Sequence, residues 1–191
     1  LISNAGQREI TLTGSGFIPP AQLILSENQI QFPSTYTGEI SEQELTISNT
    51  GGKTLVISSI DSNKSTFTVT PSKLEIDPGE SEVLALQFQP TQVGAQKGQL
   101  TFESNVGLYT VQLSAQAETT PPKLMVSVDN LDFGLLEQMG AKKIILDLNN
   151  TGGSQLEISS VDVTPNQPFA LATDKQIVIA GNQSEPLEIV F

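Results

Sequence analysis

Apolar residues in this chain alternate with polar ones and do not recur at helical spacing. Leu84, Leu86 and Phe88 form one two-residue ladder, and Leu45 with Ile47 forms another. Such alternation places one side of a strand on a core and the other in water, as antiparallel sheets allow. No stretch of ten or more residues combines helical periodicity with a cap. The pattern predicts an all-β chain.

Turn residues separate these ladders at regular intervals. Glycine occurs in the runs at 50–53 (Thr-Gly-Gly-Lys), 77–80 (Asp-Pro-Gly-Glu) and 105–107 (Asn-Val-Gly). We interpret 50–53 as a tight hairpin turn whose paired glycines take positive φ at little cost. Short strands with such turns between them are typical of a sandwich or barrel. We predict strands near 22–26, 30–33, 42–49, 54–60, 66–70, 73–77, 82–89, 97–104 and 108–117.

The chain also repeats itself. The Asn-Thr-Gly-Gly run at 49–52 returns at 150–153, and residues 1–60 align without a gap on residues 102–161. A period of 101 residues is too long for a solenoid repeat, whose units reach roughly 50 residues. It indicates a tandem array of independent domains, and seven to nine short strands in about 100 residues is the immunoglobulin-like size class.

The phase of the repeat predicts the domain organisation. Residues 1–18 correspond to the terminal strand of a preceding module, 19–120 form a complete module, and 121–191 form a partial module that lacks its last strands. Phe191 is then the counterpart of Phe88. Pro-Pro pairs at 19–20 and 121–122 favour short, semi-rigid linkers. The fold class is tandem immunoglobulin-like β-sandwich modules joined by Pro-Pro linkers, and the chain is a piece of a longer array.

Composition narrows the function classes. The net charge is −12, with 21 acidic and 9 basic residues and no His or Cys. The acids are spread over both modules, and without a basic patch neither nucleic acid nor an anionic membrane is an expected partner. Without His and Cys, Ser-His-Asp and Cys-His catalysis, thiolate metal sites and disulfides are excluded within this chain.

The remaining candidate chemistry rests on carboxylates and loops. We interpret the closely spaced acid pairs as solvated strand edges and turns; they are Asp129/Asp132, Glu42/Glu44, Glu80/Glu82 and Glu185/Glu188. Asp61, Asp162 and Asp77 could contribute to a calcium site, but no Asp-rich ligand run is present. Capping of loose backbone N–H groups explains Asp61 and Asp162 more simply.

Two loop motifs are weaker signals. Lys53 follows the glycine pair, but a phosphate loop needs a following helix, and an alternating strand follows here. Three formal N-glycosylation sequons begin at Asn63, Asn149 and Asn182 and are expected by chance in a Ser/Thr/Asn-rich chain. We therefore expect no catalytic, cofactor-binding or metal-binding residue, no cofactor, and no enzymatic activity.

The order of these motifs resembles the immunoglobulin-like modules of the ASH/Hydin and major-sperm-protein-like group, and most of all the bacterial repeats often labelled "choice-of-anchor D". The resemblance covers the whole chain as one full and two partial modules. It is carried by Ser48-Asn49-Thr50-Gly51-Gly52, Leu55–Ile60, Phe67-Thr68-Val69, Ile76–Ser81, Leu86–Pro90, Gly98–Phe102 and Val111–Ala115. The second module departs from it, because Ala180-Gly181-Asn182 replaces the Pro-Gly turn and Thr173 stands where Pro71 is expected.

The resemblance implies a non-catalytic scaffold. We expect a structural or adhesive repeat of a large bacterial surface or extracellular protein, acting as a spacer or fibre-forming scaffold with protein partners or neighbouring repeats. One alternative is a cytoplasmic, cilium-associated docking module of the ciliary or centrosomal type. Another is an accessory domain of a secreted enzyme.

The phase suggests one further hypothesis. Residues 8–16 of one subunit could complete the module that ends at Phe191 in another, which would give head-to-tail self-assembly. Counterparts of residues 89–101 are present in neither partial module, which argues against it.

Overall fold

The computed structural model of the chain describes residues 2–135, 140–164, 168–171 and 176–191, and every regular element in them is a β-strand. One compact unit comprises residues 1–33, 41–88 and 96–115, and the other comprises 34–40, 89–95 and 116–191. Strands β11 (Gly94–Ser104) and β12 (Gly107–Glu118) run through both units. Strand order therefore defines the two sandwiches better than this division does.

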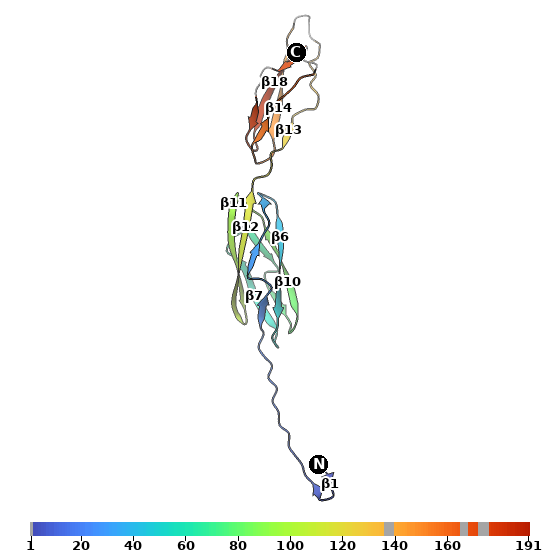
Figure 1. Cartoon of the computed structure of the whole chain (residues 1–191), viewed down its shortest axis with the longest axis vertical. Coiled ribbons are helices and arrows are strands. Elements are labelled where there is room, and N and C mark those ends of the chain that lie inside the picture. Colours follow the sequence, from blue (N-terminus) through green and yellow to red (C-terminus); the bar gives the residue numbers. More distant parts are fainter. Residues whose placement is uncertain (1, 136–139, 165–167, 172–175) are drawn as a thin grey trace. The chain divides into compact units, whose positions relative to one another are not determined.

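The first sandwich has two sheets (Figure 1). One has the order β3-β6-β10-β8; the other has the order β4-β12-β11-β7-β9, with β5 paired to β12. Pairing is antiparallel except where β12 meets β4 and β5 in parallel. The remaining bounds are β3 Leu23–Leu25, β4 Gln29–Gln31, β5 Thr35–Tyr36, β6 Ser41–Asn49, β7 Leu55–Ser62, β8 Phe67–Thr70, β9 Leu74–Ile76 and β10 Ser81–Phe88.

The second sandwich repeats part of this plan. One sheet has the order β13-β14-β18-β16, matching β3-β6-β10-β8, and the other pairs β15 with β17. A separate hairpin, β1 with β2, precedes both sandwiches. The bounds are β1 Ile2–Ser3, β2 Gly6–Gln7, β13 Leu124–Val126, β14 Lys143–Asn150, β15 Leu156–Ile158, β16 Ala170–Leu171, β17 Ile177–Ile179 and β18 Ser184–Val190.

The fold is the immunoglobulin-like sandwich that the sequence predicts, with four differences. The short strand β5 was not predicted. The segment at 50–53 is no hairpin, because β6 and β7 lie in different sheets. Residues 8–18, expected to form a terminal strand, carry no strand, and neither does 131–134, the counterpart of the strand predicted at 30–33. In the first sandwich the equivalent segments pair with each other, as β12 and β4, and in the described part of the chain neither 8–18 nor 131–134 forms a strand pairing of this kind.

Each sandwich has a three-ring centre. In the first, Phe67 stacks on Phe88 with ring centroids 4.8 Å apart, and Phe32 lies 5.5 and 5.8 Å from these two rings. The second repeats the cluster with centroid separations of 5.1 to 5.9 Å between Phe133, Phe169 and Phe191. The predicted correspondence of Phe191 with Phe88 therefore holds in space.

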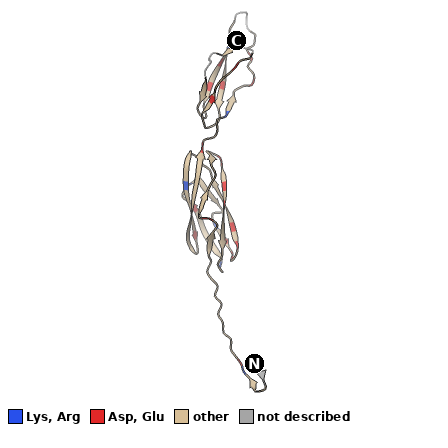
Figure 2. Cartoon of the chain, in the orientation of Figure 1, with Lys and Arg blue, Asp and Glu red and all other residues tan. Residues whose placement is uncertain are grey.

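Aliphatic residues surround these rings. In the first sandwich the buried ones come from both sheets; they include Leu45, Ile47, Leu84, Leu86, Leu55, Ile57, Ile60, Leu100, Val111 and Leu113. The second has a smaller fully buried cluster, formed by Leu148, Ile179 and Leu187. Acidic residues lie on strands of both sandwiches (Figure 2). No helix in the described residues is long and apolar enough to cross a membrane.

The turn at 77–80 and its counterpart at 180–183 differ in sequence but have the same backbone geometry. In the first sandwich Gly79 takes φ +83°, and Glu80 N donates to Asp77 O at 3.1 Å. In the second Asn182 takes φ +58°, and Gln183 N donates to Ala180 O at 3.2 Å. Asn tolerates this left-handed conformation better than other residues with a side chain. Thr173, the other noted departure, lies outside the described residues.

We expect Asn182→Ala to lower the free energy of unfolding of the second sandwich by about 1 kcal/mol, because alanine resists the left-handed conformation. Asn182→Gly should leave it unchanged or raise it, since glycine adopts positive φ freely. Urea unfolding followed by far-UV circular dichroism measures both variants. Equal stability of the alanine and glycine variants would contradict this account.

Candidate functional site

The most distinctive local structure is centred on Asn49, a fully buried polar residue at the end of β6. Its Oδ1 accepts hydrogen bonds from Gln22 N at 3.1 Å and Gly51 N at 3.0 Å. Its Nδ2 donates to Lys53 O at 2.8 Å and Ile76 O at 2.9 Å. One amide thus ties the start of β3, the turn after β6 and the end of β9 together, which satisfies a group that would be costly to bury alone.

Asn150, 101 residues later, repeats this network. Its Oδ1 accepts from Lys123 N and Gly152 N, each at 3.1 Å. Its Nδ2 donates to Ser154 O at 2.7 Å and to Ile179 O at 3.1 Å. Asn150 is 1% exposed, so the second sandwich buries its asparagine as completely as the first. The agreement shows that the Asn-Thr-Gly-Gly repeat encodes one tertiary arrangement.

The glycines of this repeat are required by close backbone approach. Neither Gly51 nor Gly52 takes positive φ, contrary to the predicted hairpin turn. A Cβ on Gly51 would instead collide with Pro20 O and lie 2.6 Å from Ala21 C, and one on Gly52 would lie 2.8 Å from Pro19 Cδ. The segment carrying the Pro-Pro pair thus runs directly across the two glycines. We call the Asn-Thr-Gly-Gly turn, at 49–52 and 150–153, the linker socket.

The second linker socket holds its segment in the same way. A Cβ on Gly152 would collide with Pro121 O and lie 2.7 Å from Pro122 Cα. Gly153 N donates to Thr120 Oγ1 at 2.7 Å, and Ser154 N donates to Thr120 O at 2.9 Å. In the first socket Gly52 N lies 3.2 Å from the carbonyl oxygens of both Pro19 and Pro20.

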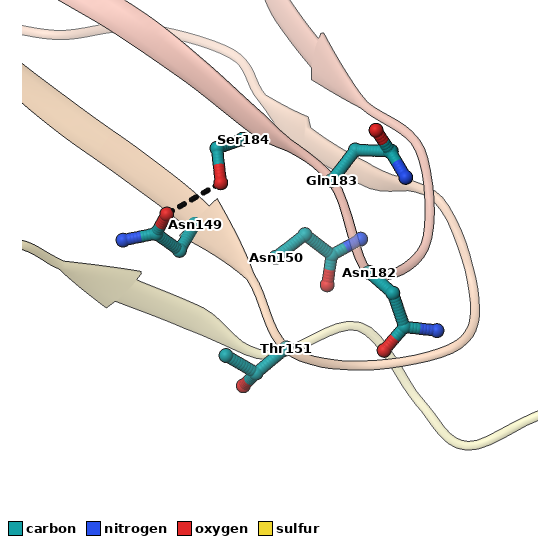
Figure 3. A pocket seen from close by; sticks show the side chains of 6 residues that line it. All are labelled: Asn149, Asn150, Thr151, Asn182, Gln183 and Ser184. Atoms are coloured by element: carbon teal, nitrogen blue, oxygen red, sulfur yellow. Dashed lines mark hydrogen bonds between the residues drawn. The ribbon is translucent and has the colours of Figure 1, made fainter.

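The outer side of the second socket forms a shallow polar pocket (Figure 3). Asn149 Oδ1 accepts from Ser184 Oγ at 2.5 Å there. None of the lining residues can serve as a proton donor or nucleophile near neutral pH without an activating base. The pocket can therefore offer hydrogen bonds but no evident reaction chemistry. Its lining residues are Asn149, Asn150, Thr151, Asn182, Gln183 and Ser184.

The acidic residues noted as close pairs in the sequence either bond to other residues or are exposed. Glu42 Oε1 accepts from Gln87 Nε2 at 2.8 Å, Asp132 Oδ1 accepts from Gly134 N at 2.8 Å, and Glu188 pairs with Lys143. The other members, Glu44, Glu80, Glu82, Asp129 and Glu185, are exposed.

The calcium candidates are not brought together. Among the described residues no three acidic side chains form a group that could hold a metal ion. Asp77 accepts a hydrogen bond from Thr54 Oγ1 at 3.2 Å. Asp61 is exposed within β7, where its backbone pairs with Thr101. The predicted turn-capping role of Asp61 is therefore wrong, because the strand continues past the point where the sequence pattern ends it.

Sequence reasoning missed the role of Asn49 and Asn150. Their recurrence before a glycine pair was visible, but the signal was interpreted as turn chemistry. Burial of an asparagine with every amide atom bonded depends on segments 27 to 29 residues away in the chain, which no local pattern shows.

Comparison of the structure with solved structures finds similar chains, and the three described next are at most 20% identical with TM-scores below 0.5. An ASH/PapD-like domain of human CEP192 (PapD-like domain 7) matches with a TM-score of 0.46 and 19% identity, over 59% of this chain and 96% of that chain. A protein of unknown function from Porphyromonas gingivalis W83 matches with a TM-score of 0.44 and 20% identity, over 88% and 82% of the two chains.

A third match is the CsuC–CsuE chaperone and tip adhesion subunit complex of Acinetobacter baumannii. It has a TM-score of 0.43 and 14% identity, over 87% of this chain and 89% of that chain. A comparison with curated proteins finds no match. The model of the HYDIN/CFA65/VesB-like Ig-like domain matches residues 21–118, just over half of the 191 residues. The chain therefore belongs to the HYDIN/CFA65/VesB-like Ig-like domain family.

Proposed function

We propose that this chain is a non-catalytic spacer segment of a large bacterial surface or extracellular protein, built from repeats of the choice-of-anchor D kind. The observation that carries the proposal is the linker socket, which holds the Pro-Pro segment by backbone contacts in both sandwiches. The same contacts contribute to the stability of each sandwich, but they also fix the direction in which the segment enters it. A repeat that holds a set direction between neighbours needs a segment fixed in this way.

The bonding of the segment between the sandwiches supports this role. Glu118 is the last residue of β12, and its carbonyl accepts from Thr37 N at 2.9 Å. Thr119 Oγ1 lies 2.8 Å from Ser154 Oγ, and Thr120 bonds with Gly153 and Ser154. Thr119 and Thr120 follow the last residue of β12 directly. We expect a segment bonded in this way to turn less freely than a flexible linker.

The acidic surface is consistent with a spacer. The net charge of −12 is distributed over both repeats, which disfavours self-association of like-charged surfaces and keeps an extended protein soluble. The core is aliphatic and phenylalanine-rich and contains no cysteine, so its stability does not depend on the redox state of the compartment.

Spin-label distance measurements test the proposal, because the chain has no native cysteine and two can be introduced at chosen sites. Labels at Glu103→Cys and Glu157→Cys, both exposed, report on the two sandwiches. We expect a narrow distance distribution. Gly152→Ala should broaden it, because the new Cβ occupies the position of the Pro121 carbonyl and lifts the segment from the socket.

Two further variants test whether a broader distance distribution comes from the linker socket and not from any glycine substitution or from unfolding. Gly14→Ala is the matched control, since nothing lies within 4 Å of a Cβ built on Gly14, and it should leave the distribution unchanged. Thr120→Val removes one socket hydrogen bond from outside the sandwich and should broaden the distribution without unfolding it. A broad distribution in the unsubstituted chain would refute the proposal.

A further inference from the structure

Strand β3 forms one edge of its four-stranded sheet in the first sandwich, and in the described part of the chain it pairs only with β6. Gln22 O accepts from Thr50 N at 3.0 Å, so Gln22, and two residues later Ile24, bond toward β6. Backbone groups alternate in direction along an antiparallel strand. Those of Leu23 and Leu25 therefore point away from the sheet, where another strand can pair with them.

This edge lacks the features that usually keep sheet edges from pairing, which are charged side chains and proline within the strand. Strand β9, an edge of the other sheet, contains Glu75 and lies between Lys73 and Asp77. Strand β8, the opposite edge of the same sheet, ends directly before Pro71. Residues 10–26 contain no charged side chain, and β3 consists of Leu-Ile-Leu. It is therefore the least protected of these three edges.

The outward side chain of β3 is apolar in both repeats. Leu23 is buried, whereas Ile24 lies on the opposite face of the strand and is 44% exposed. Ser48, which is paired with Ile24 on β6, is polar. The counterpart of Ile24 on β13 is Met125, which is 50% exposed and is paired with Asn149. Single exposed apolar residues are common, but recurrence at the same edge position in both repeats indicates a surface that another chain covers.

We propose that β3 pairs in antiparallel orientation with β3 of a second copy of the chain, which joins two four-stranded sheets edge to edge. The pairing has two-fold symmetry, with Ile24 opposite Ile24 of the second copy and Leu23 opposite Leu25 of the second copy. Leu23 and Leu25 then exchange backbone hydrogen bonds on both sides of the axis. The two isoleucines form a non-hydrogen-bonded pair, in which side chains lie closest, so each covers the other. Strand β13 offers the same pairing, with Met125 in place of Ile24.

Charge favours a second copy at this edge over other surfaces of the chain. The net charge of −12 makes most surfaces of two copies repel each other. Exposed charges further apart than about 8 Å are largely screened at physiological ionic strength, so the local charge decides. The register places Glu27, the first charged residue after β3, opposite Ala21 of the second copy. The two Glu27 residues are then about 20 Å apart along the strand, and the contact between them is uncharged.

A single cysteine tests the register, because the chain has none of its own. Ile24→Cys places two thiols in a non-hydrogen-bonded pair, whose Cα separation of about 4.5 Å allows a disulfide. Under mild oxidation we expect it to form a cross-linked dimer at least tenfold faster than Val83→Cys. Val83 is the matched control, because it is 52% exposed on the outward face of the same sheet, two strands away from the edge.

Analytical ultracentrifugation tests the association without cysteines. The mass of the unsubstituted chain should rise from 20.4 kDa to at least twice this value as concentration increases. The double variant Ile24→Lys with Met125→Lys should weaken association at least tenfold, because like charges then lie opposite each other. It also lowers the net negative charge, so general repulsion does not explain the loss.

The matched control places the same two charges away from the edges. Val83→Lys with Ile145→Lys alters exposed residues on inner strands of the two sheets and should leave the association unchanged. Circular dichroism verifies that both double variants remain folded. A chain that stays monomeric at all concentrations would overturn the second copy as the occupant of this edge. Equal cross-linking of Ile24→Cys and Val83→Cys, or association that survives the Ile24 and Met125 substitutions, would overturn the proposed register and surface.

Discussion

Asn49→Ala is expected to lower the free energy of unfolding of the first sandwich by about 3–5 kcal/mol, among the larger effects of a single substitution. The change leaves four backbone groups without a partner: Gln22 N, Gly51 N, Lys53 O and Ile76 O. Each buried unsatisfied group costs about 1–3 kcal/mol, and the groups nearest the surface regain part of this from water. Hydrogen exchange measured by mass spectrometry detects the loss in peptides of the first sandwich.

Two controls make this prediction specific. Asn28→Ala changes an exposed asparagine and should have an effect below about 0.5 kcal/mol. Asn49→Asp keeps the acceptor for the two N–H groups but faces the carbonyls of Lys53 and Ile76 with an oxygen, so it should not restore stability. Protection in peptides from β14 and β18 should stay unchanged in all three variants. A loss below about 1 kcal/mol in Asn49→Ala would show that the network contributes little.

The strands were largely predictable, because the alternation that defines them is local. Leu84, Leu86 and Phe88 point to one core from sequence spacing alone, and the structure buries all three. The sequence showed that Asn182 and its neighbours replace the Pro-Gly turn, but it did not show that Asn182 takes the left-handed conformation of Gly79. The structure was needed to match these two residues, because they lie 103 positions apart instead of 101.

Long-range contacts were the part that sequence reasoning could not supply. A glycine pair is consistent with positive φ and with close backbone approach, and only the position of Pro20 and Pro121 decides between them. The ring clusters could not be predicted from the repeat either, because the spacing of their phenylalanines differs. Phe133 and Phe169 are one residue further apart in the sequence than their counterparts Phe32 and Phe67. Local pattern thus predicted the sheets, whereas the linker socket and the packed rings depend on which segments meet.

Phe88→Ala is expected to lower the free energy of unfolding of the first sandwich by about 3–5 kcal/mol, since it removes a fully buried ring and leaves a cavity. Phe67 and Phe32 lose their stacking partner at the same time, and such aromatic pairs add about 0.5–1.5 kcal/mol beyond area burial. Urea unfolding monitored by circular dichroism, with hydrogen exchange to assign the sandwich, measures the change.

The two repeats provide a matched comparison for this cavity. Phe191 occupies the same place in the second cluster but is only partly buried, so Phe191→Ala should cost less than Phe88→Ala. Val83→Ala on the same strand as Phe88 alters a side chain that is 52% exposed on the opposite face, and its effect should stay below about 0.5 kcal/mol. Equal losses for Phe88→Ala and Phe191→Ala would mean that the second cluster packs its rings as tightly as the first. The difference between the two losses therefore measures what the fuller burial of Phe88 contributes to stability.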